Sequence, residues 1–307
     1  MSPILEVKDL SLTVPTGHVL QKQKCILDRV SFDIPRGVST AYLGPNGAGK
    51  TSTFRILCGL CKANQGSILY NGNPIQHGLP AKSIGFMPEQ PYFYKNLTPS
   101  ELLTGLAQIS GIRKKDLPLI IHNWAEKLLF SDILHQPLHA CSKGQVQRVG
   151  LAQAMLHEPE FILLDEPLSG LDPLGRELVR NVLLEAKNNG ATLLFSSHIL
   201  PDAEAICEQV IILNKGHISY QGSMSKLLDF EQKWVISLQG EPIIRKHTEL
   251  KPLTDNSYQL IVENQKERDD IIQLILSSTE TKLLAVEKQR HTLEDAFINI
   301  LNHGSAQ

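Results

Sequence analysis

The chain has 307 residues, of which 42% are hydrophobic and 20% are charged, and its formal net charge is −2. Nucleic-acid-binding proteins usually carry a basic excess, so this balance argues against a nucleic-acid partner. The longest apolar runs are only a few residues long, whereas a membrane-spanning helix needs about 20. The acidic Glu6 and Asp9 do not fit a signal peptide, and we expect a soluble, intracellular chain with one large and one small domain.

Five cysteines are scattered along the chain, at positions 25, 58, 61, 141 and 207. An odd, dispersed set argues against a disulfide framework. Cys58 and Cys61 have the C-x-x-C spacing of redox and zinc sites, but no second pair or clustered histidine completes such a site. We interpret them as buried apolar residues, with a metal or redox site as the alternative.

Hydrophobic periodicity predicts the elements of the first hundred residues. In chain order they are a strand at 4–14, a polar loop to Lys24, strands at 26–34 and 38–43, a helix at 52–60, a hairpin around Asn71-Gly72 and a strand at 84–87.

A glycine-rich segment connects the strand at 38–43 to the helix at 52–60. It reads Gly44-Pro45-Asn46-Gly47-Ala48-Gly49-Lys50-Thr51, followed by Ser52, and it fits the phosphate-binding motif G-x-x-x-x-G-K-[ST]. Glycines let backbone N–H groups surround a phosphate, and the helix N-terminus favours the anion. We expect Lys50 to contact the β- and γ-phosphates and Thr51 to bind Mg²⁺, with a chance glycine-rich turn as the alternative.

The middle of the chain is helical. Thr98-Pro99-Ser100-Glu101 forms a capping box ahead of an apolar stripe that ends at Gly111, and a second helix is predicted at 117–130. Strands and helices alternate in the part of the chain that follows. The predicted elements are a strand at 161–164, a helix at 172–189, a strand at 193–195 and a hairpin of strands 210–213 and 217–220. This alternation predicts a mostly parallel sheet covered by helices.

The apolar strand at 161–164 runs into Asp165 and Glu166. A carboxylate at such a strand end can hold Mg²⁺ beside a phosphate loop, and the next carboxylate can polarise an attacking water. Alternatively, the two acidic residues cap the following helix.

After residue 230 a β-β-α-β-α pattern carries no chemical motif. Its strands are expected at 234–238, 258–262 and 283–288, and its helices at 266–277 and 292–301. We therefore divide the chain into 1–230, with a helical subdomain at about 92–155, and a small accessory domain at 231–307.

Around Ser142, Gly144 and Gln145 the chain resembles the ATP-binding subunits of ABC transporters, whose signature reads Leu-Ser-Gly-Gly-Gln. Ser169-Gly170-Leu171-Asp172 looks like the family's dimer-contact loop. His198 matches the switch histidine, and Gln90 matches the glutamine that links the ATP site to the membrane partner.

The resemblance implies an α/β fold: a P-loop ABC ATPase core with an antiparallel β subdomain and a helical subdomain, followed here by a small α+β domain. Two such chains would dimerise head to tail and trap two ATP molecules. Glu166 would be the general base, and His198 would contact the γ-phosphate. Asp165 would bind Mg²⁺ with Thr51 and Gln90, while Ser142, Gly144 and Gln145 would act on ATP held by the other subunit.

Two departures from the family pattern stand out. Lys143 replaces the first signature glycine and Cys141 the leading leucine, and this Ser-Lys-Gly form resembles a subgroup of exporters (ABC-2-like). The family usually stacks adenine on an aromatic residue well before the phosphate loop, but none occurs here before Phe32. His18 is a candidate replacement, or simply a solvated loop histidine.

Thr292 to Phe297 resembles the ending of subunits paired with export permeases, although packing of a terminal helix would use the same residues. We predict an ATPase that works with a separate membrane permease and a second copy of itself at the cytoplasmic face of the membrane.

The alternative is an ABC ATPase acting on ribosomes or DNA, which usually carries two cassettes or long inserts. A regulator that no longer hydrolyses ATP is disfavoured because Glu166 is present.

Overall fold

The structure is a computed structural model that describes residues 2–16, 22–228, 233–240, 250–253, 256–262, 264–289 and 292–303. The chain forms two compact units. One comprises the residues up to Met224 and those from Ile300 onward, and the other comprises Ser225–Asn299. The first unit contains every candidate site residue from Gly44 to His198.

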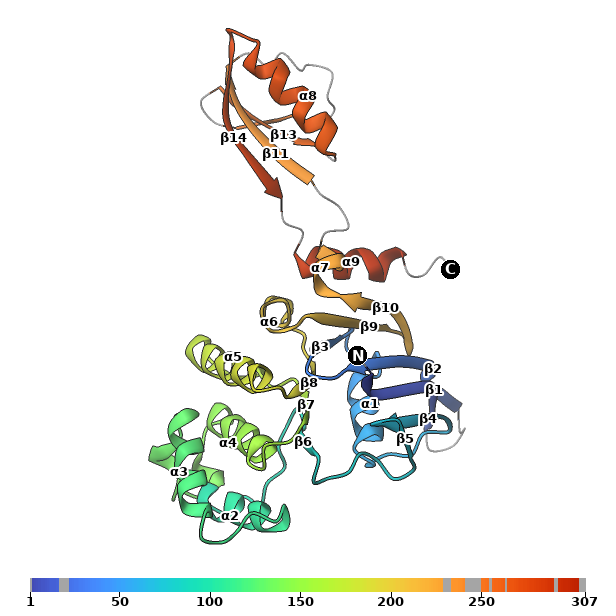
Figure 1. Ribbon diagram of the computed structural model, residues 1–307, viewed down its shortest axis with the longest axis vertical. Helices are drawn as coiled ribbons and strands as arrows, with labels where there is room; N and C mark the ends of the chain where they lie inside the picture. The colour runs from blue at the N-terminus through green and yellow to red at the C-terminus, as the bar shows by residue number, and fades with distance from the viewer. Residues whose placement is uncertain are drawn as a thin grey trace. The chain divides into compact units, whose positions relative to one another are not determined.

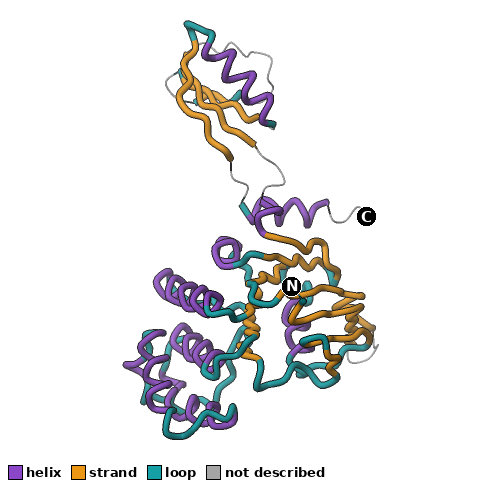
Figure 2. The backbone as a smooth tube through the Cα atoms, in the orientation of Figure 1, coloured by secondary structure: helices purple, strands orange, loops and turns teal. Residues whose placement is uncertain are grey.

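A six-stranded sheet forms the centre of the first unit (Figures 1 and 2). Its strand order is β10 (His217–Ser223), β9 (Gln209–Asn214), β3 (Ser39–Leu43), β8 (Thr192–Ser196), β7 (Phe161–Asp165) and β6 (Ile84–Met87). All neighbours pair in parallel except β10, which is antiparallel to β9. Every residue of β3, β7 and β8 is buried, as expected of central strands covered on both faces.

Helix α1 (Lys50–Leu57) packs on one face of this sheet, together with a second, antiparallel sheet (Figure 1). That sheet has the order β2 (Lys22–Pro35), β1 (Pro3–Thr16), β4 (Gln65–Tyr70) and β5 (Asn73–Ile75). Phe54 and Leu57 of α1 belong to one buried apolar cluster with Leu27 of β2 and Leu163 of β7. Burial of this cluster is the main free-energy gain that joins the two sheets.

On the opposite face lie α4 (Lys143–Met155), α5 (Pro173–Asn188) and α6 (Leu200–Ile206), as Figure 1 shows. Helix α4 approaches β6 so closely that a Cβ on Gly85 would clash with the carbonyl oxygen of Ala154. Helices α2 (Pro99–Ile109) and α3 (Leu117–Lys127) pack with α4 as a helical group. The predicted capping box begins α2, since Thr98 Oγ1 accepts from Glu101 N at 3.2 Å.

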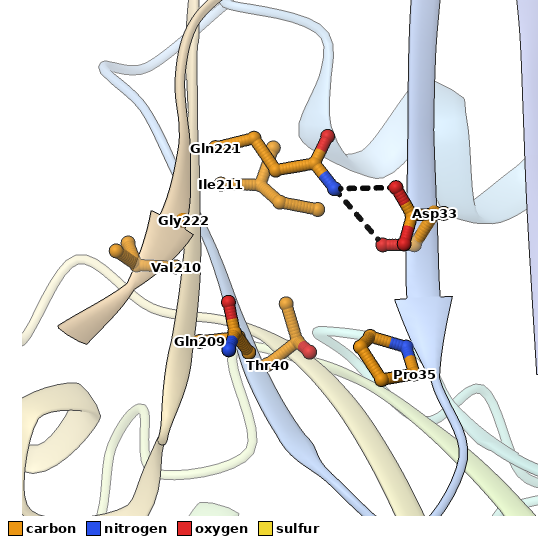
Figure 3. Close-up of a pocket in the computed structure, with 8 residues that line it drawn as sticks. All are labelled: Asp33, Pro35, Thr40, Gln209, Val210, Ile211, Gln221 and Gly222. Carbon is orange, nitrogen blue, oxygen red and sulfur yellow. Dashed lines mark hydrogen bonds between the residues drawn. The ribbon is translucent and has the colours of Figure 1, made fainter. Parts of the chain in front are cut away.

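A side-chain bridge ties β2 to β10 beside a cavity of about 380 Å³ (Figure 3). Gln221 Nε2 donates to both the carbonyl oxygen and Oδ1 of Asp33, each at 3.1 Å. Further along β2, Asp28 N donates to Gly216 O in the β9–β10 turn at 2.9 Å. These bonds fix β2 relative to the central sheet.

The second unit contains a four-stranded antiparallel sheet with α8 (Gln265–Leu276) packed against it. Its strand order is β12 (Lys251–Pro252), β13 (Ser257–Val262), β11 (Lys233–Gly240) and β14 (Thr281–Gln289). Ile236, Leu260, Ile271 and Ile275 are central to its apolar core. Helices α7 (Met224–Leu228) and α9 (Leu293–His303) span the two sequence boundaries of this unit.

The α/β fold class, with its antiparallel sheet, helical group and small α+β unit, is confirmed. Several boundaries differ from the predictions. Strand β2 already begins at Lys22, and α1 spans 50–57 because Gly59, with φ of 72°, ends it. Cys58 and Cys61 are half-buried against the apolar cluster. Within the described ranges, no group of three or more His, Cys, Asp or Glu could hold a metal ion. Among those same residues, no helix is long and apolar enough to span a membrane.

Candidate active site

The phosphate loop lies between the end of β3 and the start of α1. Ala48 N donates to Pro45 O at 3.1 Å, which closes the turn. Gly49 has φ of 114°, and a Cβ there would lie 2.6 Å from Leu27 Cδ2. Only glycine meets both conditions without strain, which explains the second glycine of the G-x-x-x-x-G-K-[ST] motif in physical terms.

Lys50 begins α1 and is only 8% exposed. Its Nζ donates to Gly44 O at 2.6 Å, so the side chain curls back over the loop that it follows. Burial lowers the pKa of Lys50, while the carboxylates of Glu166, Asp165 and Glu89 oppose that shift. The ammonium group is therefore held in a partly desolvated site, where it attracts phosphate strongly.

The register of β7 against β8 brings Asp165 opposite Ser196. Ser196 Oγ donates to Asp165 Oδ1 at 2.6 Å and accepts from Glu166 N at 2.9 Å. One hydroxyl thus orients both acidic residues, and it leaves Asp165 Oδ2 without a hydrogen-bond partner among the described residues.

Glu166 has a left-handed backbone, with φ of 52°. Such a conformation costs about 1–3 kcal/mol in a residue other than glycine and persists only where the surroundings hold it. Gln147 Nε2 donates to Glu166 O at 3.2 Å. His198 donates to Glu166 Oε2 through its backbone N at 3.1 Å and through Nδ1 at 2.6 Å. Ser196 and Gln147 therefore hold the backbone of Glu166, while His198 holds its carboxylate through Oε2 and leaves Oε1 free of these bonds.

A cavity of about 570 Å³ brings most of the predicted residues together at the carboxyl ends of the parallel strands. Its lining residues are Lys24, Ile26, Asn46, Gly47, Gly49, Lys50, Thr51, Ser52, Glu89, Asp165, Glu166 and His198. Gly44, Pro45 and Ala48 form the loop beneath it. Gln90 is not among the residues that line the cavity, and its Oε1 accepts a hydrogen bond from Tyr92 OH at 3.4 Å. The preceding residue, Glu89, lines the cavity instead.

The signature residues form a separate feature. Ser142 caps α4, where its Oγ accepts from Gln145 N at 3.2 Å and its N donates to Gln145 Oε1 at 2.8 Å. Of the described residues, neither Ser142 nor Gly144 lines the 570 Å³ cavity. The exposed side chain of Lys143 lies over Gly170, with Nζ 3.3 Å from where a Cβ would stand.

Sequence reasoning missed five residues: Ser196, Gln147, Glu89, Lys24 and Ile26. A polar residue ending the apolar strand β8 was the available signal for Ser196. Gln147, 1% exposed, is a polar residue on the buried face of α4 and could have been found by periodicity. Glu89, Lys24 and Ile26 carried no signal of this kind. His18 lies outside the described residues.

A family model described as ABC transporter matches residues 27–169. An ABC transporter ATP-binding protein of Synechocystis sp. is 34% identical over 304 residues, which cover 97% of this chain and 84% of the relative. The ABC transporter ATP-binding protein YxlF of Bacillus subtilis is 36% identical over 282 residues, which cover 89% of this chain and 93% of the relative.

Solved structures agree with these relatives. An ATP-binding subunit of an ABC transporter matches with a TM-score of 0.64 and 32% identity, over 73% of this chain and 91% of that one. A dimeric ATP-binding cassette bound to ADP and Pi has a TM-score of 0.66 and 21% identity, over 72% of this chain and 98% of that one. This similarity supports the fold. The chain therefore belongs to the ABC transporter family as an ATP-binding subunit, an ABC ATPase.

Proposed function

We propose that two copies of this chain form a head-to-tail dimer that couples ATP binding and hydrolysis to export through a separate membrane permease. One observation carries the proposal: the cavity gathers Lys50, Asp165, Glu166 and His198, but among the described residues it lacks Ser142 of the signature. An ATP site that needs both sets of groups must take the second set from another subunit.

The phosphate loop and Ser52 hold the triphosphate in this scheme, with Lys50 on the β- and γ-phosphates. Thr51 and Asp165 supply the hydroxyl and carboxylate oxygens that Mg²⁺ prefers, and both line the cavity. Mg²⁺ typically takes one or two carboxylates and completes its shell with phosphates and water, so this donor set fits it. Gln90 would join it after a rearrangement of its loop. When bound, the metal neutralises charge on the phosphates.

Glu166 acts as the general base and takes a proton from the attacking water on its free Oε1. His198 keeps the carboxylate in place through Oε2, and as a residue lining the same cavity it would contact the γ-phosphate. Ser196 positions Asp165 and Glu166 together.

Ser142 and Gly144 complete the partner's site from the N-terminus of α4, where the free N–H groups and the helix dipole favour a phosphate. A Cβ on Gly144 would meet nothing closer than 3.5 Å in its own subunit, so the small residue leaves room for a partner. Because the γ-phosphate would join the two subunits, ATP favours the closed dimer and hydrolysis releases it.

Export is supported by the Ser142-Lys143-Gly144 sequence and by the resemblance of 292–297 to subunits of export permeases. The membrane partner would hold the chain at the cytoplasmic face of the membrane. Tyr92 and Tyr94, beside Gln90, are 90% and 82% exposed and offer an apolar contact for that partner.

A photoreactive amino acid at position 92 tests the permease partnership. In membranes from the source cells, we expect it to cross-link to an integral-membrane protein with several spans, identified by mass spectrometry. The matched control places the same group at Leu60, which is 67% exposed, and should not capture that protein. Cross-linking of ribosomal proteins from position 92 would contradict a transport role and favour the rival function.

A further inference from the structure

Helix α6 connects the catalytic site to a helix that the chemistry described so far does not use. It begins at Leu200, two residues after His198, and it lies beside α5 (Figure 1). Helix α5 begins directly after the loop at 169–172, where the Asp172 side chain caps it. One pair of helices therefore carries both the histidine that holds Glu166 and the loop that resembles the family's dimer contact.

A buried ion pair joins these two helices. Asp202 of α6 is 6% exposed, and its Oδ1 accepts from Nη2 of Arg180, on α5, at 3.3 Å. A carboxylate removed from water is strongly destabilising unless a cation and hydrogen bonds compensate for the lost hydration. Arg180 supplies that compensation. The position of Asp202, and of the short helix that carries it, therefore depends on α5.

The polar atoms around this ion pair are incompletely bonded. Among the described residues, five buried side-chain nitrogen and oxygen atoms lack a hydrogen-bond partner, and three of them are Arg176 Nε, Arg180 Nε and Asp202 Oδ2. The two arginines are one turn apart on α5 and share one of its faces. Buried polar atoms are nearly always bonded, so this concentration of unpartnered ones requires a reason other than stability. Control of where α6 lies on α5 is such a reason.

The segment between Asp202 and the site is short and tightly bonded. Ser197 Oγ accepts from Ile199 N at 2.9 Å and donates to Ile199 O at 3.1 Å, so the backbone on either side of His198 is tied together. His198 in turn donates to Glu166 Oε2 through N and through Nδ1. A shift of α6 along α5 would therefore move His198 and the carboxylate that it holds.

We propose that Asp202 is a positioning residue for ATP hydrolysis, which holds α6 on α5 through Arg180 and thereby places His198. The inference rests on the proposed roles of His198 and Glu166. Because α5 begins at the dimer-contact loop, a partner subunit that docks on this loop also sets the position of α6. The ion pair thus makes the geometry of the general base depend on dimer closure. Asp202 is not among the described residues that line the nucleotide cavity, so nucleotide binding does not require it.

Steady-state ATPase kinetics of Asp202→Asn in the full chain test this inference. Asparagine keeps the shape of the side chain and removes its charge. We expect kcat to fall by about 10- to 100-fold, because a misplacement of about 1 Å near the reacting atoms can cost as much. The KM for ATP should stay close to that of the wild type, since the residue does not touch the nucleotide.

Arg180→Met provides a second, independent variant at a half-buried position. It should lower kcat by the same factor as Asp202→Asn. The double variant should be no worse than either single one, because two residues that act as one unit have non-additive effects. Arg180→Lys keeps the cation and should retain most of the wild-type kcat.

Glu208→Gln is the matched control. Glu208 pairs with Lys187 Nζ at 2.7 Å and also joins α5 to the α6 region, but Lys187 lies in the last turn of α5, away from the dimer-contact loop. Replacement of Glu208 removes an ion pair of the same helix without disturbing the start of α6. It should leave kcat unchanged.

The NMR signal of the His198 ring separates positioning from a general loss of structure. The signal is identified in protein with isotope-labelled histidine by its absence from His198→Ala. Asp202→Asn should shift it, and Glu208→Gln should leave it in place. Melting curves and AMP-PNP affinities check that each variant is folded.

An unshifted His198 signal or a wild-type kcat in Asp202→Asn would overturn the inference. A double variant whose kcat falls by the product of the two single effects would do the same, since it shows that Asp202 and Arg180 act separately. These outcomes leave the proposed function intact as long as Glu166→Gln abolishes turnover. Wild-type turnover in Glu166→Gln would instead overturn the role of the general base itself.

Discussion

Replacement of Glu166 by glutamine is expected to lower ATP turnover by about 10²–10⁴-fold while ATP binding stays close to that of the wild type. Glutamine has the shape of glutamate, and its Oε1 can still accept the hydrogen bond that His198 N donates at 3.1 Å. It cannot take a proton from water. Because hydrolysis releases the proposed dimer, the variant should accumulate as an ATP-bound dimer. Phosphate release and size-exclusion chromatography with ATP measure the two effects.

Glu158→Gln is a suitable control for that experiment. Glu158 also has a left-handed backbone, with φ of 52°, but it does not line the nucleotide cavity. Its replacement should leave both turnover and dimerisation unchanged. Wild-type turnover in Glu166→Gln would show that another group removes the proton.

Replacement of Lys50 by alanine should weaken ATP binding by about 10- to 100-fold, the range expected when a hydrogen bond to a charged group is lost. The change also leaves Glu89, Asp165 and Glu166 in the cavity without the buried ammonium that offsets their charge. Those carboxylates then repel the triphosphate. Turnover should fall at least as far, because the γ-phosphate loses its main contact.

The free energy of unfolding without nucleotide should change little in Lys50→Ala. Burial lowers the pKa of Lys50, so the folded state disfavours its charged form, and removal of the ammonium relieves that penalty as it removes the bond to Gly44 O. Lys62→Ala, at an exposed position shortly after α1, is the control and should bind ATP normally. Wild-type affinity in Lys50→Ala would contradict the assignment of this lysine to phosphate.

The sequence was most informative where local chemistry decides the structure. The glycine pattern of 44–51 required a strand before it and a helix after it, and β3 and α1 occupy those places. The apolar strand ending at Asp165 could be predicted just as readily from the sequence, because a central parallel strand needs apolar residues on both faces.

Other features depend on contacts between distant segments, which no local pattern contains. Helix α6 was not predicted, because it has only seven residues and one of them is Pro201. Its stability comes from burial of Leu200, Ala203 and Ile206 against the rest of the fold. The pairing of Ser196 with Asp165 requires the register of β7 against β8. The position of Lys24 in the cavity depends on β2 extending through a polar stretch that looked like a loop.

A mixture of two inactive variants tests most directly whether the ATP site is shared between subunits. Lys50→Ala removes the phosphate half, and Ser142→Arg blocks the signature half. In a mixed dimer of the two, one site carries both changes, while the other combines an intact Lys50 with the partner's intact signature.

An equal mixture should recover about a quarter of wild-type ATPase activity, because half of the dimers are mixed and each has one intact site of two. If Lys50 and Ser142 instead worked within one subunit, every subunit in the mixture would be defective. The activity would then stay at the level of the separate variants, and that result would contradict a composite site.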